Sequence, residues 1–154
     1  MTEMQSDASI EQALASVPAD LWEQLFEVAH SFLAEPEHTA WDGGQQVGTT
    51  TVNDEKRAVF QMPYASYSDS VERIVALLYE IGVVHPFDWS NWEGTDRYRG
   101  RNALRTAPVA DAARMATVIV RSDRFCEGTI AAAIEDGTFA AVLERLLRWY
   151  DSER

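Results

Sequence analysis

The sequence predicts a mainly α-helical fold, in one compact domain of five or six helices with at most a small β-hairpin. Its 154 residues are about what one compact domain contains. A composition with 46% hydrophobic and 25% charged residues is that of an ordinary globular protein. Four segments place apolar residues at the three- and four-residue spacings of amphipathic helices, whereas only the stretch from Thr49 to Met62 has the composition of strands.

The first eight residues are polar and acidic, so we expect residues 1–8 to be disordered and residues 9–154 to form the helical domain. A short first helix ending at Pro18 follows from apolar residues at helical spacing, namely Ile10, Ala13, Leu14 and Val17. A stronger helix is predicted from Pro18 to about Ala34, because proline is favoured in a first helical turn and the apolar stripe after it is wide.

Residues 35–56 are rich in turn-forming residues, including a pair of glycines and Asn53-Asp54. A hairpin is predicted here, in which Thr49–Val52 pairs with Ala58–Met62 across a loop of residues 53–56. The next helix is predicted to begin at Ser68 or Asp69 and to end at Gly82, a residue suited to a left-handed terminator.

The segment after Gly82 contains an aromatic turn, in which Pro86 blocks a helix and Asp88 or Ser90 can cap a short new one. Residues 97–105 are predicted to be helical with their arginines exposed. Three further helices are expected: one that starts at Pro108 and is interrupted at residues 124–129, one over Ile130–Ile134 closed by Gly137, and a last one capped by Thr138.

The charge of the chain is unevenly distributed. The formal net charge of −12 argues against direct nucleic-acid binding, because phosphate contacts need Lys and Arg. Residues 1–56 carry eleven Asp and Glu against one Lys, whereas residues 97–124 carry seven Arg against two Asp. The basic segment therefore either pairs internally with the acidic one or presents guanidinium groups that suit carboxylate or phosphate ligands.

We expect a cytoplasmic location. The single cysteine, Cys126, cannot form an intramolecular disulfide, and the acidic start of the chain does not resemble a signal peptide. The longest apolar runs fall far short of the roughly 20 residues that cross a bilayer, so we expect no membrane association. Cys126 is interpreted as a small buried hydrophobe, with a nucleophilic thiolate as the alternative.

The sequence contains no motif that indicates a metal or a cofactor. The three histidines, His30, His38 and His85, are scattered and lack partners at metal-ligand spacing. Gly43-Gly44 lacks the Gly-Lys-Ser/Thr ending of a phosphate-binding loop. We therefore expect neither.

Two segments are candidates for a ligand-binding site. One has the pattern Pro-Phe-Asp-Trp-x-x-Trp and offers Asp88, Trp89 and Trp92; the other has the pattern Arg-x-Asp-Arg-Phe-Cys-Glu-Gly and offers Arg121 and Arg124 at a spacing that can clamp an anion. The competing interpretation is structural: Asp88 pairs with one of the two arginines, and the tryptophans fill the space between helices.

These two blocks, with Pro63-Tyr64 before them, resemble an uncharacterised bacterial family of unknown function over roughly residues 18–148. The resemblance implies a small cytoplasmic domain, and it implies no activity, cofactor or catalytic residue.

The leading functional hypothesis is a non-enzymatic cytoplasmic binding or regulatory module that recognises a protein partner or a small anionic ligand. The first alternative is an enzyme acting on a nucleotide or phosphorylated substrate, with Arg121 and Arg124 on phosphate, Trp89 or Trp92 stacking a base, and Asp88 or Glu127 as general base. The second is an acidic inhibitor that mimics nucleic acid.

Overall fold

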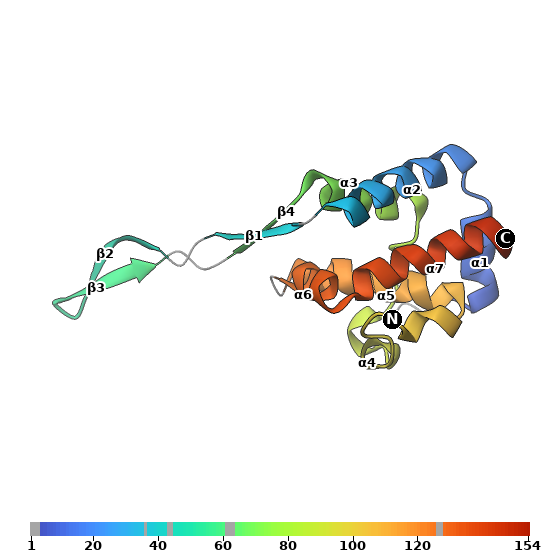
Figure 1. The fold of residues 1–154 in the computed structure, drawn as a ribbon. Helices are drawn as coiled ribbons and strands as arrows, with labels where there is room; N and C mark the ends of the chain where they lie inside the picture. Colours follow the sequence, from blue (N-terminus) through green and yellow to red (C-terminus); the bar gives the residue numbers. More distant parts are fainter. Residues whose placement is uncertain (1–3, 36, 43–44, 61–63, 126–127) are drawn as a thin grey trace.

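The fold is a helical body from which a narrow arm of β-strands projects (Figure 1). A computed structural model describes residues 4–35, 37–42, 45–60, 64–125 and 128–154. Helices predominate, which confirms the mainly α prediction. The helical elements are α1 (Asp7–Ala15), α2 (Ala19–Ala34), α3 (Asp69–Ile81), η1 (Trp89–Asn91), α4 (Gly94–Arg97), η2 (Ala103–Thr106), α5 (Val109–Asp123), α6 (Thr129–Asp136) and α7 (Thr138–Ser152), where η marks a 3₁₀ helix.

The described residues form seven α-helices, where five or six were expected. The predicted helix over residues 97–105 is instead two short pieces, α4 and η2, because Gly100 between them has a φ of +95° that a right-handed helix cannot contain. None of the described helices is both long enough and apolar enough to cross a membrane.

Most helix boundaries agree with the sequence. The Ser68 hydroxyl accepts a hydrogen bond from the Val71 N–H at the start of α3, and Gly82 ends that helix with a φ of 90°. The predicted cap of the last helix is wrong. Thr138 lies inside α7, and its hydroxyl donates to Asp136 at 2.6 Å instead of capping the helix.

The arm consists of two antiparallel two-stranded sheets, whereas one small hairpin was expected. Near the body, β1 (Thr39–Asp42) pairs with β4 (Tyr64–Tyr67); beyond them, β2 (Gln46–Val52) pairs with β3 (Glu55–Phe60). Asn53 and Asp54 both have positive φ, as the central residues of a two-residue hairpin turn require, so this turn is shorter than predicted.

Two hydrogen-bonded side chains attach the base of the arm to the body. The Tyr67 hydroxyl donates to Asp123 of α5 at 2.8 Å, and the same Asp123 oxygen accepts the Ile130 N–H at 3.0 Å. Asp123 therefore satisfies a backbone donor in the first turn of α6 while it holds the arm.

Helix α5 is the centre of the body. Apart from the half-buried Asp111, every residue from Val109 to Val120 is buried, and α1, α6, α7 and η1 all pack against it. Four of the buried residues are alanines, which let neighbouring helices approach closely.

Arg114 is the charged residue in this buried stretch, with 4% of its surface exposed. Its Nη1 donates to Asp111 at 2.7 Å and to Asp7 at 2.6 Å, and its Nη2 donates to the Gln5 carbonyl at 2.8 Å. Burial alone would lower the pKa of Arg114, but the hydrogen bonds to the two carboxylates outweigh burial and raise it. Asp7 is the first residue of α1, and the expected disorder of residues 1–8 stays a prediction.

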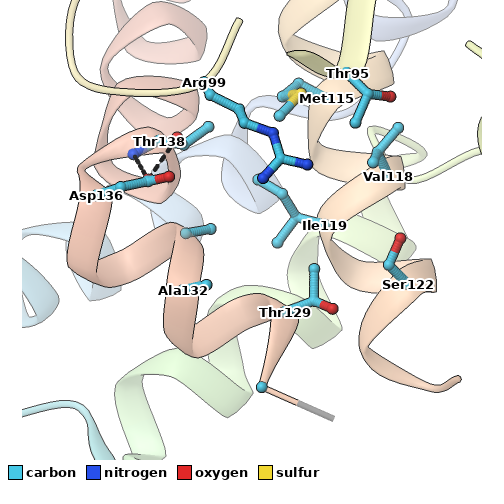
Figure 2. Close-up of a pocket in the computed structure, with 12 residues that line it drawn as sticks. Thr95, Arg99, Met115, Val118, Ile119, Ser122, Thr129, Ala132, Asp136 and Thr138 are labelled. Atoms are coloured by element: carbon cyan, nitrogen blue, oxygen red, sulfur yellow. Dashed lines mark hydrogen bonds between the residues drawn. The ribbon is translucent and has the colours of Figure 1, made fainter. Parts of the chain in front are cut away.

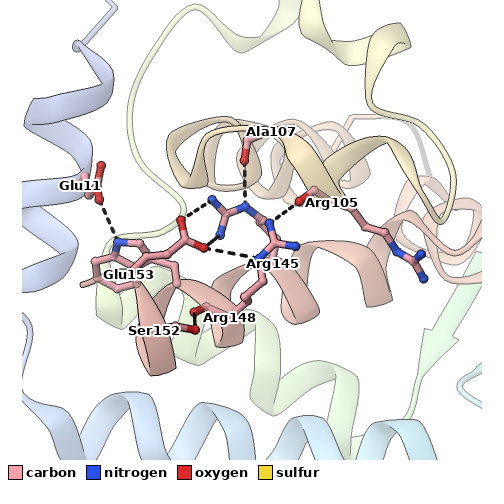
Figure 3. Close-up of polar contacts among 8 residues, drawn as sticks. Glu11, Arg105, Ala107, Arg145, Arg148, Ser152 and Glu153 are labelled. Carbon is pink, nitrogen blue, oxygen red and sulfur yellow. Dashed lines mark hydrogen bonds and ion pairs between the residues drawn. The ribbon is translucent and has the colours of Figure 1, made fainter.

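The end of α7 is fixed by a second arginine network (Figure 3). Arg145 donates through Nε to the Ala107 carbonyl at 2.8 Å and through both terminal nitrogens to Glu153 at 2.9 and 3.0 Å. Arg148 bonds to the Arg105 carbonyl. The bidentate Arg145 contact lowers the pKa of Glu153, so this network couples α7 to the chain around η2.

His85 lies where the chain leaves α3 and crosses α5. Its Nδ1–H donates to the Val83 carbonyl at 2.8 Å, and its backbone N–H donates to the Thr117 hydroxyl at 3.2 Å. Its Nε2 is buried without a hydrogen-bond partner among the described residues. Burial lowers the pKa of His85, the Val83 bond opposes that shift, and the positive charge of Arg114 adds to it.

Replacing Arg114 should destabilise the fold strongly. Arg114→Ala removes the partner of a half-buried Asp111 and of Asp7, and losing one member of a buried ion pair costs about 3–5 kcal/mol. The exposed Arg124 is the matched control, and Arg124→Ala should change stability by less than about 0.5 kcal/mol. Urea denaturation of both variants measures the difference; equal stabilities would contradict the anchoring role.

Acid should destabilise the protein through His85. Because the pKa of His85 is lowered in the folded state, below about pH 6.5 the unfolded chain binds a proton that the folded chain does not. This contribution reduces stability as the pH falls from 6.5 toward the folded pKa and is absent above 6.5. In denaturation curves between pH 7.5 and 5.5, His85→Gln should lose less stability than wild type, whereas the exposed control His30→Gln should follow wild type.

Candidate functional site

A cavity of about 380 Å³ lies between α5, α6 and the segment that follows α4 (Figure 2). Its apolar wall consists of Met115, Val118, Ile119, Ala132 and Ala133, and its polar side chains are Thr95, Arg99, Ser122, Thr129, Asp136 and Thr138. A volume of this size and a mostly apolar lining with a few polar groups are typical of small-molecule sites.

Arg99 provides the positive charge of this cavity. Its side chain extends across the space between α5 and α6, above Ile119 (Figure 2). Among the described residues its one ion pair is with Asp96, through Nε at 3.3 Å, and both side chains are largely exposed. The two terminal nitrogens of the guanidinium therefore have no described carboxylate partner and can bind an incoming anion.

The backbone after Arg99 is held on one side by Thr138. The Gly100 N–H donates to the Thr138 hydroxyl at 2.7 Å, and Asp136 accepts from both the hydroxyl and the N–H of Thr138. These bonds connect the loop to the junction of α6 and α7. They also occupy one oxygen of Asp136, the carboxylate that lies beside Thr138 on the α6 side of the cavity (Figure 2).

The backbone before Arg99 is held by Tyr98. The Tyr98 hydroxyl donates to Asp111 at 2.5 Å, and its ring stacks on Trp92 at 5.9 Å. Burial raises the pKa of Tyr98, and the bond to the Asp111 carboxylate raises it further. Arg99 thus stands between two anchored neighbours, which reduces the entropy that its backbone would lose on binding.

Another cleft, of about 120 Å³, is rich in arginine. It is lined by Arg101, Arg105, Arg145 and Arg148 together with Ala141 and Glu144. Glu153 binds the guanidinium groups of Arg145 and Arg148, so half of this positive charge is already paired. The larger Arg99 cavity is consequently the better candidate for an anionic ligand.

The predicted site residues do not line the Arg99 cavity. Asp88 accepts hydrogen bonds from Ser90 and Asn91, and it forms no ion pair with Arg121 or Arg124 among the described residues. Asp88 and Trp92 instead line a separate cavity of about 240 Å³, which also contains Glu93 and whose charge is therefore negative.

Trp89 brings the two predicted segments together in part. Its ring stacks on that of the exposed Phe125 at 6.1 Å, next to Arg124 at the end of α5. Arg124 is exposed, and Arg121 is half-buried with its Nε buried and unpartnered among the described residues. Cys126 and Glu127 lie outside the described residues, so the thiol and general-base hypotheses on them stay predictions.

The sequence could have indicated Arg99 only as one of the arginines in the basic segment 97–124. Its neighbours in the cavity come mostly from α5 and α6, more than fifteen residues further along the chain. The hydroxyl residues among them have no regular spacing in the sequence from which a pocket could be predicted. No group of three or more His, Cys, Asp and Glu side chains in the described part of the chain could hold a metal ion.

A family model described as a family of unknown function (DUF6508) matches residues 17–152. This range includes α2 to α7 and the arm, and it agrees with the resemblance over residues 18–148. No curated protein and no solved structure matches the chain. It stays a prediction that the two sequence blocks are characteristic of this family. A bacterial origin also stays a prediction. The chain belongs to the family of unknown function DUF6508.

Proposed function

We propose that this protein is a binding module for a small anionic molecule with an apolar body, held in the Arg99 cavity. The observation that carries the proposal is the Arg99 guanidinium, whose two terminal nitrogens have no carboxylate partner among the described residues, beside an apolar wall in a cavity of the size that small ligands occupy. The anionic group, a carboxylate, would bind Arg99, and the apolar body would lie against Val118, Ile119 and Ala132.

Binding has better support than catalysis at this site. Asp136 is the carboxylate among the described lining residues, and Thr138 already donates two hydrogen bonds to it. Both bonds go to one oxygen of Asp136, and the described lining residues include no His, Cys or second carboxylate that would complete an acid–base pair with the other oxygen. The nucleotide or phosphorylated-substrate enzyme and the nucleic-acid mimic stay as alternative predictions, and a cytoplasmic location is part of the proposal.

The ligand should be recognised by its charge through Arg99. Thermal-shift measurements with hexanoate and benzoate, each compared with its uncharged amide, should show that only the carboxylates raise the melting temperature. Arg99→Gln should weaken carboxylate binding about 10- to 100-fold, because a hydrogen bond to a charged group contributes about 1.5–3 kcal/mol. Arg57→Gln, on an arginine of β3 that is similarly exposed and pairs with Glu55, is the control and should bind as wild type does. Equal stabilisation by acids and amides would contradict the proposal.

The apolar wall should be required independently of the charge. Ala132→Phe places a ring in the cavity from the exposed side of α6 without changing any charged group, so it should prevent binding while the unfolding midpoint stays near that of wild type. Ala76→Phe, on the exposed face of α3, is the matched control. Calorimetric titration with hexanoate distinguishes the two variants. Unchanged affinity in Ala132→Phe would show that the ligand binds elsewhere.

A further inference from the structure

The outer hairpin of the arm has no hydrophobic core of its own. All thirteen residues of β2 and β3 are exposed, and both strands project away from the helical body (Figure 1). An isolated two-stranded hairpin is marginally stable in water, and each of its edges presents unpaired backbone N–H and C=O groups. Another strand added to one edge would stabilise it.

The two edges of this hairpin differ in charge. Strand β3 begins with Glu55, Lys56 and Arg57, and charged side chains are a common protection of an edge strand against pairing. Strand β2 has the sequence QVGTTTV, with no charged residue and no proline. Its one irregularity is a register shift between Gln46 and Gly48. The β2 edge is therefore the one open to a further strand.

The strand that fits this edge best is β2 of a second copy of the chain. An antiparallel pairing about a twofold axis at Thr50 sets Thr50 opposite Thr50 of the second copy and Thr49 opposite Thr51. Thr–Thr pairs of this kind stabilise antiparallel sheets.

The charge of the molecule also favours contact through the arm. The chain carries −12, so two bodies in contact would repel each other, whereas residues 46–60 have two acidic and two basic side chains and no net charge. The seven residues of β2 extend about 23 Å at 3.3 Å per residue. That distance is more than twice the roughly 8 Å Debye length at physiological ionic strength, so the bodies would be screened from each other.

We infer that the β2 edge is a homodimerisation surface, on which β2 of a second copy pairs antiparallel to form a four-stranded sheet in the order β3-β2-β2-β3. The charged β3 strands would then lie at both outer edges, which limits the assembly to two chains. This inference does not depend on the Arg99 cavity.

The test is the oligomeric state of the full chain, measured by sedimentation velocity from low micromolar to about millimolar concentration, because interfaces this small are weak. Wild type should shift from one chain toward two as concentration rises. The double variant Thr49→Lys with Thr50→Lys places like charges opposite each other in the dimer and should remain a monomer, as should Thr49→Glu with Thr50→Glu. Mixing the two variants should restore a dimer through Lys–Glu pairs.

Ala58→Lys adds the same charge on β3, in the position opposite Thr49 within the hairpin, and should still dimerise. Helical circular dichroism confirms that each variant is folded. A wild type that stays monomeric over the whole range would overturn the proposal, as would a dimer that survives the double lysine change. Loss of the dimer in Ala58→Lys, or a mixture that stays monomeric, would reject β2 edge pairing in this register.

Discussion

The buried charge of Arg114 constrains much of the helical body. Helix α5 is enclosed by other helices, so a guanidinium in its middle must find its counter-charges inside the protein. One of them, Asp111, lies one turn earlier in the same helix; the other, Asp7, comes from α1 and brings the N-terminal helix onto α5. The second oxygen of Asp111 accepts the Tyr98 hydroxyl, and Tyr98 precedes Arg99. The ion pair that satisfies a buried arginine thus also positions the exposed arginine of the candidate site.

The candidate cavity follows from the choice of side chains around it. Alanines on α6 and branched residues on α5 leave an apolar space, and Gly100, at a φ that only glycine adopts readily, turns the chain so that Arg99 reaches over it. Thr138 fixes that turn through the Gly100 N–H. The cavity is therefore built on rigid elements and shaped before any ligand arrives, which is the arrangement that keeps the cost of binding low.

The arm differs in kind from the body. The body is stabilised by burial around α5, whereas β2 and β3 bury almost nothing within one chain. Among the described residues, the base of the arm is attached to the body by Tyr67 through Asp123. Trp41 lies against Gly128 beside the cavity, since a Cβ added at Gly128 would be 2.7 Å from the Trp41 ring. The arm and the candidate site thus lie next to each other.

The sequence by itself determined the helical class and most boundaries of the long helices, because periodicity, Pro18, Ser68, Gly82 and Pro108 act locally. It left open whether the basic segment pairs with the acidic one, and the ion pair of Asp7 with Arg114 is such a pair. It did not determine the second pair of strands, since the pairing of β1 with β4 joins short segments some twenty residues apart. Only the tertiary structure decided the site. Asp88 and Trp92 line a negatively charged cavity, whereas Arg99 lines a mostly apolar one. The apolar cavity forms where α5 and α6 approach each other, and local sequence patterns do not predict which helices will pack together.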